Sequence, residues 1–265
     1  MALSEELSLP KIRRTWFSVM AVVFALIFGV GLFGWVGLVF GWTSGGVGQI
    51  HRVHDIGSSG VATGIFVALP LLIVAWRRED IALLQMLGVA AIATVIGSVV
   101  ALDWVFLVYV VILAVPVVVL LAISKGWGRF VSRGAGIAPE LLVAAVVTAP
   151  FWGAFALTMA RLQRAGPPND PHVEMHHWTG MAIMGIGVLL MGVLASSRTT
   201  GWRIVAWLTG LGSIVYGVAS AVFATYPGSS VPYPGSEGSL WGTLAIVWGA
   251  LFIALAERRA RMASP

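Results

Sequence analysis

Apolar residues occur along the chain in long stretches that are separated by short polar segments. A helix that crosses a bilayer core about 30 Å thick needs roughly 20 predominantly apolar residues. Eight such stretches are present, at 16–42, 57–76, 81–102, 104–123, 138–160, 178–197, 203–226 and 239–257. The pattern predicts an all-α integral membrane protein with eight transmembrane helices.

The composition agrees with this pattern and excludes several classes of function. Hydrophobic residues make up 58% of the 265 residues and charged residues 10%, whereas soluble domains carry about 25% charged residues. An ordinary soluble enzyme, a disordered chain and a nucleic-acid binder are excluded, and a lipid bilayer is the expected partner. The absence of cysteine rules out disulfides, thiolate metal sites and covalent haem attachment.

Basic residues predict how the helices are oriented. If the N-terminus is cytoplasmic and the spans alternate, 13 of the 16 Lys and Arg residues lie on the cytoplasmic side. Only Arg52, Arg161 and Arg164 then lie on the outer side. Because cytoplasmic loops carry an excess of Lys and Arg, we expect both termini in the cytoplasm and a multi-pass protein of the cell (plasma or inner) membrane.

A short polar motif occurs twice and indicates an internal repeat. His51, His54 and Gly57 open the second stretch with the same spacing as Glu174, His177 and Gly180 at the sixth, 123 positions later. Four spans return the chain to its starting side, so the two copies would have parallel topology. We therefore expect two repeated four-helix bundles, at residues 1–130 and 131–265.

The histidines are the main candidates for chemistry. Imidazole binds haem iron, copper or zinc, and ionisable groups at membrane depth are functional candidates. Three interpretations stay open, namely a haem site, a copper or zinc site, and solvated interfacial residues. His172 follows a proline-rich loop, and we expect it to be the least buried. All five histidines lie in two places, which are His51 and His54, then His172, His176 and His177.

A haem site would need axial imidazoles, an apolar slot between helices and partners for the propionates. We expect His54 and His177 to be the axial ligands of a b-type or related haem, with the metal bound by these two residues. Arginine pairs well with carboxylates, so the three outer arginines are candidate propionate partners. The remaining candidate cofactor-binding residues are His51, His176, Glu174, Arg52, Arg161 and Arg164.

The Glu174-x-x-His177 motif at the start of a helix, in an eight-helix chain with two halves, resembles the heme A synthase family. In that family an outer loop leads into a helix opened by Glu-x-x-His-Arg, and the His binds haem. Here Trp178 stands in place of the Arg, and the fourth and eighth stretches contain no His. The resemblance implies two four-helix halves, haem as cofactor and, if the chain is an enzyme, an oxidoreductase.

These observations predict a cytochrome b-like membrane protein that binds haem near the outer face and acts in respiratory electron transfer or in haem handling. Two alternatives remain. One is a non-catalytic accessory subunit packed against other subunits of a respiratory complex. The other is an outer-face copper or zinc site built from the five histidines. No residue is singled out as catalytic.

Overall fold

The computed structural model describes residues 10–132, 134–167, 169–225 and 238–262. Within these ranges the chain is helical and contains no β-strand. Seven of the described helices are long and apolar enough to cross a membrane, and the bent pair α8–α9 makes an eighth if it counts as one span. The predicted all-α class and its apolar spans are therefore confirmed. Tyr226, the last residue of one predicted span, lies outside the described residues.

Several predicted spans are built from more than one helical segment. The first span consists of α1 (Lys11–Leu26), η1 (Ile27–Gly31) and α2 (Gly34–Thr43). The second runs over Gly48–Val74 and so begins before the predicted residue 57; η2 (Gly46–His51), α3 (Arg52–His54), η3 (Asp55–Ala68) and α4 (Leu69–Val74) follow one another there. The third is α5 (Ile81–Ala101), and the fourth consists of η4 (Trp104–Phe106) and α6 (Leu107–Ser124). The rest of the chain forms α7 (Trp127–Phe130), α8 (Pro139–Val147), α9 (Ala149–Ala165), α10 (Pro171–Glu174), α11 (His177–Ser196), α12 (Trp202–Val222) and α13 (Ser239–Met262).

Two spans that the hydropathy pattern predicts as continuous are broken. The first span contains the π-helix η1, after which Phe33 has a left-handed backbone with φ 62°. The break brings Gly34 so close to Gly64 of η3 that a Cβ on Gly34 would lie 2.9 Å from the Gly64 Cα. The fifth span bends by 43° between α8 and α9. Pro150 follows this bend, and its missing N–H and fixed φ account for it.

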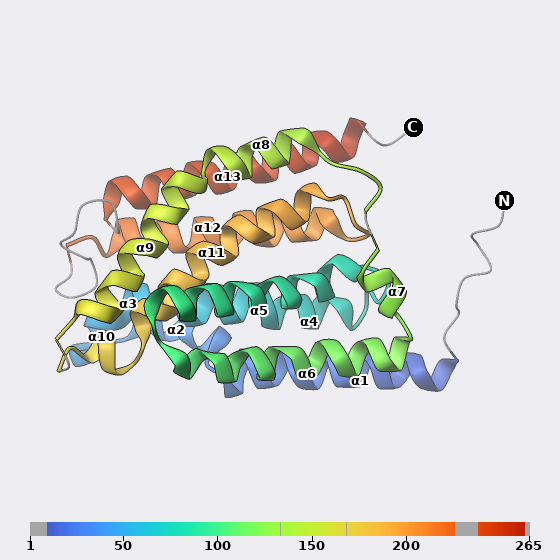
Figure 1. Ribbon diagram of the computed structural model, residues 1–265, viewed down its shortest axis with the longest axis horizontal. Helices are drawn as coiled ribbons and strands as arrows, with labels where there is room; N and C mark the ends of the chain where they lie inside the picture. Colours follow the sequence, from blue (N-terminus) through green and yellow to red (C-terminus); the bar gives the residue numbers. More distant parts are fainter. Residues whose placement is uncertain (1–9, 133, 168, 226–237, 263–265) are drawn as a thin grey trace.

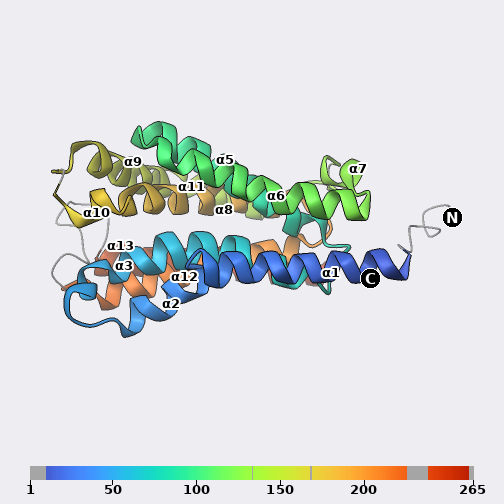
Figure 2. The ribbon, with the colours of Figure 1, turned by 90° about the horizontal axis from the view of Figure 1, so that it is seen from below.

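The helices run side by side along the long axis of the molecule (Figure 1) and form two layers (Figure 2). The centre of the bundle consists of α11, η3 and α12, whose apolar windows are the most buried. The peripheral helices α1, α6 and α13 leave most of their apolar surface uncovered. Large apolar side chains such as Val111 and Val147 point outward, which suits a lipid environment rather than water.

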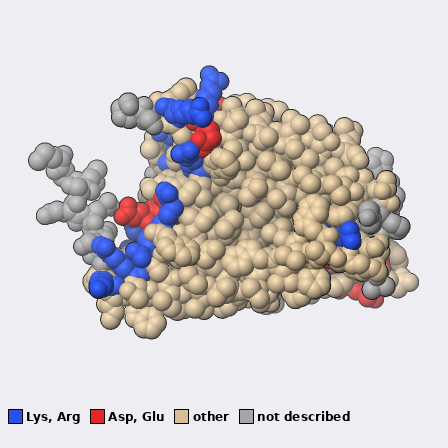
Figure 3. Space-filling model, turned by 180° about the vertical axis from the view of Figure 1, so that it is seen from behind, with Lys and Arg blue, Asp and Glu red and all other residues tan. Residues whose placement is uncertain are grey.

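Charged side chains are distributed unevenly between the two ends of the bundle. In Figure 3 the Lys and Arg residues gather mainly at one end of the face shown, and the sides between the ends carry few charges. That end holds the start of α1 and the end of α13 (Figure 1). The bundle therefore has a strongly basic end and a second end, which carries the histidines.

Candidate metal centre

All five histidines lie at the end of the bundle opposite the start of α1 and the end of α13, where α3 and α10 are seen in Figure 1. His51 ends η2 and His54 ends α3, while His172 lies in α10. His176 is the N-cap residue of α11, and His177 is the first residue of that helix. The two histidine clusters predicted from sequence are therefore brought together in one region.

Local backbone geometry positions the second histidine cluster, which consists of His172, His176 and His177. The Asp170 side chain caps α10 by accepting the His172 backbone N–H at 2.9 Å. His176 then adopts a left-handed backbone with φ 56°, which is uncommon for a residue other than glycine. This reversal turns the chain from α10 into α11 and separates the directions of the adjacent His176 and His177 side chains.

Three imidazoles form a compact group. His51, His172 and His177 each offer one ring nitrogen, and these three atoms lie within 4.8 Å of one another. The Nδ1 atoms of His51 and His177 are 3.2 Å apart. Two bare ring nitrogens repel at this distance, so either a proton or a shared cation must lie between them. The His172 and His177 side chains are largely buried, at 8% and 11% exposed.

Carboxylates lie behind two of these imidazoles. Asp170 Oδ1 is 2.9 Å from His172 Nδ1, and Asp55 Oδ1 is 3.8 Å from His177 Nε2. Burial by itself would raise the pKa of the Asp170 carboxyl, but hydrogen bonds from the His172 N–H and ring outweigh it and hold that pKa below its ordinary value. Asp55 lies on the Nε2 side of His177 and leaves Nδ1 of that ring facing His51. Both ring nitrogens of His172 have an acceptor, because Nε2 lies 3.0 Å from the Ile50 carbonyl oxygen, so this ring must release Ile50 before it can bind a metal.

His54 occupies a different place from the three grouped histidines. Its side chain is fully buried, and its ring centroid lies 4.6 Å from those of both His172 and Trp178. The His54 and His177 rings are 6.0 Å apart at an angle of 34°. Joint ligation of a haem by these two residues stays a prediction.

His176 belongs to a separate hydrogen-bonded pair. Its Nδ1 lies 2.8 Å from Asp103 Oδ2, which also accepts a hydrogen bond from Thr179 Oγ1 at 2.7 Å. The Asp103 side chain is 6% exposed. Asp103 was not among the site residues predicted from the sequence. The available signal was its position in the turn between two spans, at the same end as the histidines.

The other predicted residues lie around the cluster or away from it. Arg52 donates a hydrogen bond to the Ser44 carbonyl, and its guanidinium lies 4.9 Å from the Phe223 ring centroid. Glu174, Arg161 and Arg164 are exposed, and Glu174 is not among the described metal-ligand candidates. The structure therefore does not bring these three residues into the histidine group.

The expected exposure of His172 was wrong. The residue is 6% exposed, because the Asp170 cap folds α10 back and the His172 Nε2 reaches the Ile50 carbonyl oxygen at 3.0 Å. The proline-rich loop before it predicted a surface position. The contact with Ile50, which is distant in the sequence, buries His172 instead.

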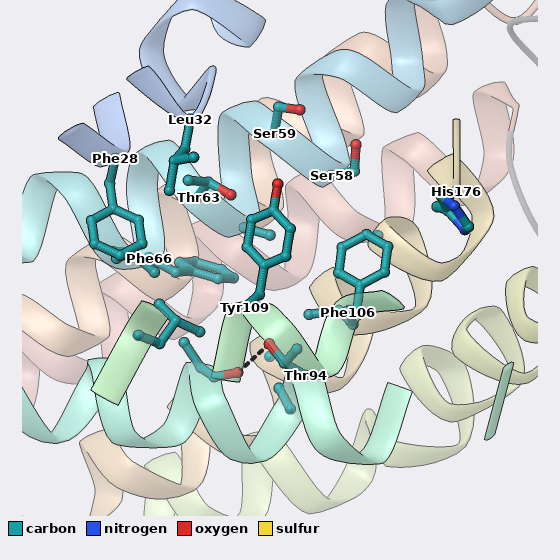
Figure 4. A pocket seen from close by; sticks show the side chains of 18 of the residues that line it. Phe28, Leu32, Ser58, Ser59, Thr63, Phe66, Thr94, Phe106, Tyr109 and His176 are labelled. Carbon is teal, nitrogen blue, oxygen red and sulfur yellow. Dashed lines mark hydrogen bonds between the residues drawn. The ribbon is translucent and has the colours of Figure 1, made fainter. Parts of the chain in front are cut away.

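A cavity of about 170 Å³ begins beside the histidines. His176 and His177 line it together with polar side chains that include Ser58, Thr63 and Tyr109. Figure 4 shows Tyr109 and Phe106 projecting from α6 and η4 across this space toward the serine- and threonine-bearing helix. The cavity connects the histidine region with the interior of the bundle.

Comparison of the chain with protein-family models, with curated proteins and with solved structures finds no match. The resemblance to the heme A synthase family therefore stays a prediction, and we assign the chain to no family.

Proposed function

We propose that this multi-pass membrane protein binds a transition-metal ion, copper or zinc, through His51, His172 and His177. The observation that carries the proposal is the convergence of three ring nitrogens within 4.8 Å of one another, from three separate helical segments. Neutral imidazole is a preferred ligand of both metals.

The distances support a metal ion more directly than a solvated cluster. In a tetrahedral site with metal–nitrogen bonds of about 2.0 Å, neighbouring ligand nitrogens lie roughly 3.3 Å apart. The His51 and His177 Nδ1 atoms already lie 3.2 Å apart. Metal-bound histidines commonly donate a hydrogen bond from their second ring nitrogen to a carboxylate or carbonyl. Asp170 accepts such a bond from His172, and the Asp55 carboxylate lies 3.8 Å from Nε2 of His177.

Three protein ligands leave a coordination position for water or a small ligand, as in catalytic rather than closed structural sites. His177 is both a proposed ligand and a wall residue of the adjoining cavity. We infer that a small molecule approaches the metal from this cavity, whose aromatic and hydroxyl side chains suit an uncharged, partly polar ligand.

The test uses the same substitution at two adjacent positions. His177→Asn removes a proposed ligand, while His176→Asn serves as the matched control. Asparagine tolerates the left-handed backbone of residue 176, and its amide can still donate a hydrogen bond to Asp103. Detergent-purified protein is titrated with Cu²⁺ or Zn²⁺ against a competing chelator.

We expect one ion per chain in the unsubstituted protein and in His176→Asn. His177→Asn should weaken metal binding by at least about 100-fold. Removing a residue that only hydrogen-bonds to a metal ligand already lowers metal affinity by about 10–100-fold. His51→Asn should behave like His177→Asn. Equal losses in the position 176 and 177 variants, or no stoichiometric binding at all, would refute the site.

A haem held between His54 and His177 is the second candidate. Its support is the proximity of two imidazoles from the two predicted halves, whose ring centroids lie 6.0 Å apart with the ring planes inclined by 34°. The His172 and Trp178 rings pack directly against His54, so a macrocycle would have to displace them, and we rank haem second for that reason. A Soret band in the visible spectrum of the purified protein would favour it over a bare ion.

We also propose that the two halves are related copies. A Cβ on Gly57 would meet Met181, and a Cβ on Gly180 would meet Ser58, so each motif glycine packs on the residue that follows the other. The first and fifth spans, which correspond in the proposed repeat, are both broken. This reciprocity supports a two-fold relation between the halves. The basic end of the bundle holds the start of α1 and the end of α13, so the positive-inside rule favours both termini in the cytoplasm.

A further inference from the structure

The basic end of the bundle contains a second cavity, of about 600 Å³, far from the histidines. It lies among the start of α1, the turn between α4 and α5, the segment around α7, and the turn between α11 and α12. Both predicted halves therefore contribute to its walls. Its volume is within the range of small-molecule sites. The arginines that line it are Arg14, Arg77, Arg78, Arg129 and Arg198.

The charge of this cavity is strongly unbalanced. Five arginines face two carboxylates, those of Glu79 and Asp80, which leaves three positive charges in excess. Asp80 is paired with Arg77, so one of the two carboxylates is already engaged. Arg14 and Arg77 are exposed, whereas Arg78, Arg129 and Arg198 are partly buried, and it is these partly buried charges that favour a compensating anion.

Three of these arginines, Arg78, Arg129 and Arg198, are partly buried. Arg78 Nε donates to Ser18 Oγ at 3.0 Å, which fixes its guanidinium. The Nε atoms of Arg129 and Arg198 are buried and have no hydrogen-bond partner among the described residues. Arg198 also adopts a left-handed backbone with φ 54°. A position strained in this way persists only where its surroundings require it.

We propose that this cavity binds the phosphate of an anionic phospholipid headgroup. Planar guanidinium groups match phosphate oxygens in paired hydrogen bonds, and the hydroxyls of Ser124 and Thr199 add donors at the same wall. Phosphate chemistry alone would also suit a free phosphate ion. The membrane source is favoured because the cavity lies at the polar end of apolar helices, beside the exposed Trp76.

Basic spaces between transmembrane helices at the cytoplasmic side are suited to anionic headgroups, and tryptophan favours the membrane interface. Since Arg129 and Arg198 come from different predicted halves, a bound headgroup would bridge the two halves. Binding to the folded state should therefore raise the unfolding temperature.

The experiment compares the unfolding temperature of the purified protein in neutral detergent under three additions. These are phosphatidylglycerol, phosphatidylcholine and inorganic phosphate at equal phosphate concentration. We expect phosphatidylglycerol to raise the unfolding temperature by about 5 °C or more. Neither phosphatidylcholine nor phosphate should reproduce this shift. Native mass spectrometry should show a retained anionic lipid on the unsubstituted chain.

Arg198→Gln and, independently, Arg129→Gln should remove most of the shift, whereas Arg261→Gln, in the last turn of α13 and outside the cavity, should retain it. The proposal would be overturned if phosphatidylcholine raised the unfolding temperature as much as phosphatidylglycerol does. It would also be overturned if phosphatidylglycerol raised the unfolding temperature of both cavity variants as much as that of the unsubstituted protein. An equal shift with inorganic phosphate alone would overturn the lipid source. If the variants do not fold, the absence of any anionic lipid on the unsubstituted chain in mass spectrometry would overturn it.

Discussion

At the scale of single residues, carboxylates decide which nitrogen each imidazole presents. Asp55 lies on the Nε2 side of His177, whose Nδ1 faces His51, and Asp170 accepts a hydrogen bond from Nδ1 of His172, whose Nε2 lies against the Ile50 carbonyl oxygen. A carboxylate also orients His176, because Asp103 binds its Nδ1 and holds this ring away from the three-histidine group. Adjacent histidines in the sequence therefore have different roles in the structure.

Asp170→Asn tests the orienting role of this carboxylate. Asparagine caps helices as well as aspartate does, so α10 should remain folded and the unfolding temperature should change little. Loss of the charged partner of His172 should weaken metal binding by about 10-fold or more, measured by chelator competition. Unchanged affinity would show that Asp170 is only a cap.

Thr179→Val tests the Asp103 cluster separately. Removing the Thr179 hydroxyl leaves the buried Asp103 carboxylate with one fewer donor, which should destabilise the fold by about 1–3 kcal/mol. Metal affinity should stay within about 3-fold of the unsubstituted protein, because Asp103 does not contact the three-histidine group. A large loss of affinity without destabilisation would instead place this cluster in the metal site.

At this scale the sequence was informative about features that depend only on which residue types are present and where they lie in the chain. The confinement of histidines to two motifs predicted that they would meet at one end. The burial of His172 and the role of Asp103 could not be predicted, because they depend on contacts with Ile50 and His176. Those contacts form only when distant turns are packed together.

At the scale of helices, close backbone approaches take the place of hydrophobic attraction, which lipid does not provide. Gly210 and Gly217 of α12 face Gly249 and Gly242 of α13, and a Cβ on Gly217 would lie 2.5 Å from the Gly242 carbonyl oxygen. The spans themselves were predictable from hydropathy. The breaks near Phe33 and Thr148 were not predicted, because hydropathy carries no information about the backbone, although Pro150 was an available signal for the second break.

Gly217→Ala should therefore destabilise the helix pair by about 1–3 kcal/mol, the usual cost of overpacking. Gly153→Ala in α9 is the matched control, since nothing lies within 4 Å of a Cβ at that position. Thermal unfolding in the same detergent compares the two variants. The close packing of α12 on α13 would be disproved if both variants unfolded at the same temperature as the unsubstituted protein.

At the scale of the whole molecule, the two ends have distinct chemistry, with arginines at one and histidines at the other. The positive-inside rule predicts that the histidine end faces outward. Charge counting alone indicated this polarity. It gave no indication that arginines from separate turns would converge on one cavity, which depends on how the turns pack.

The absence of cysteine in the chain allows this orientation to be measured by single-cysteine labelling. Glu174→Cys lies at the histidine end and Ser132→Cys at the basic end, and both positions are exposed. In intact cells a membrane-impermeant maleimide should label the first variant, and the second only after lysis. The reverse labelling pattern would show that the histidine end faces the cytoplasm.

The most direct measurement of the central claim is the X-ray absorption spectrum of the metal in the purified, metal-loaded protein. We predict three imidazole nitrogens at about 2.0 Å with an additional light-atom ligand, and loss of this signal in His177→Asn but not in His176→Asn. A coordination shell made of oxygen atoms alone, or a porphyrin-bound iron, would contradict the three-histidine site.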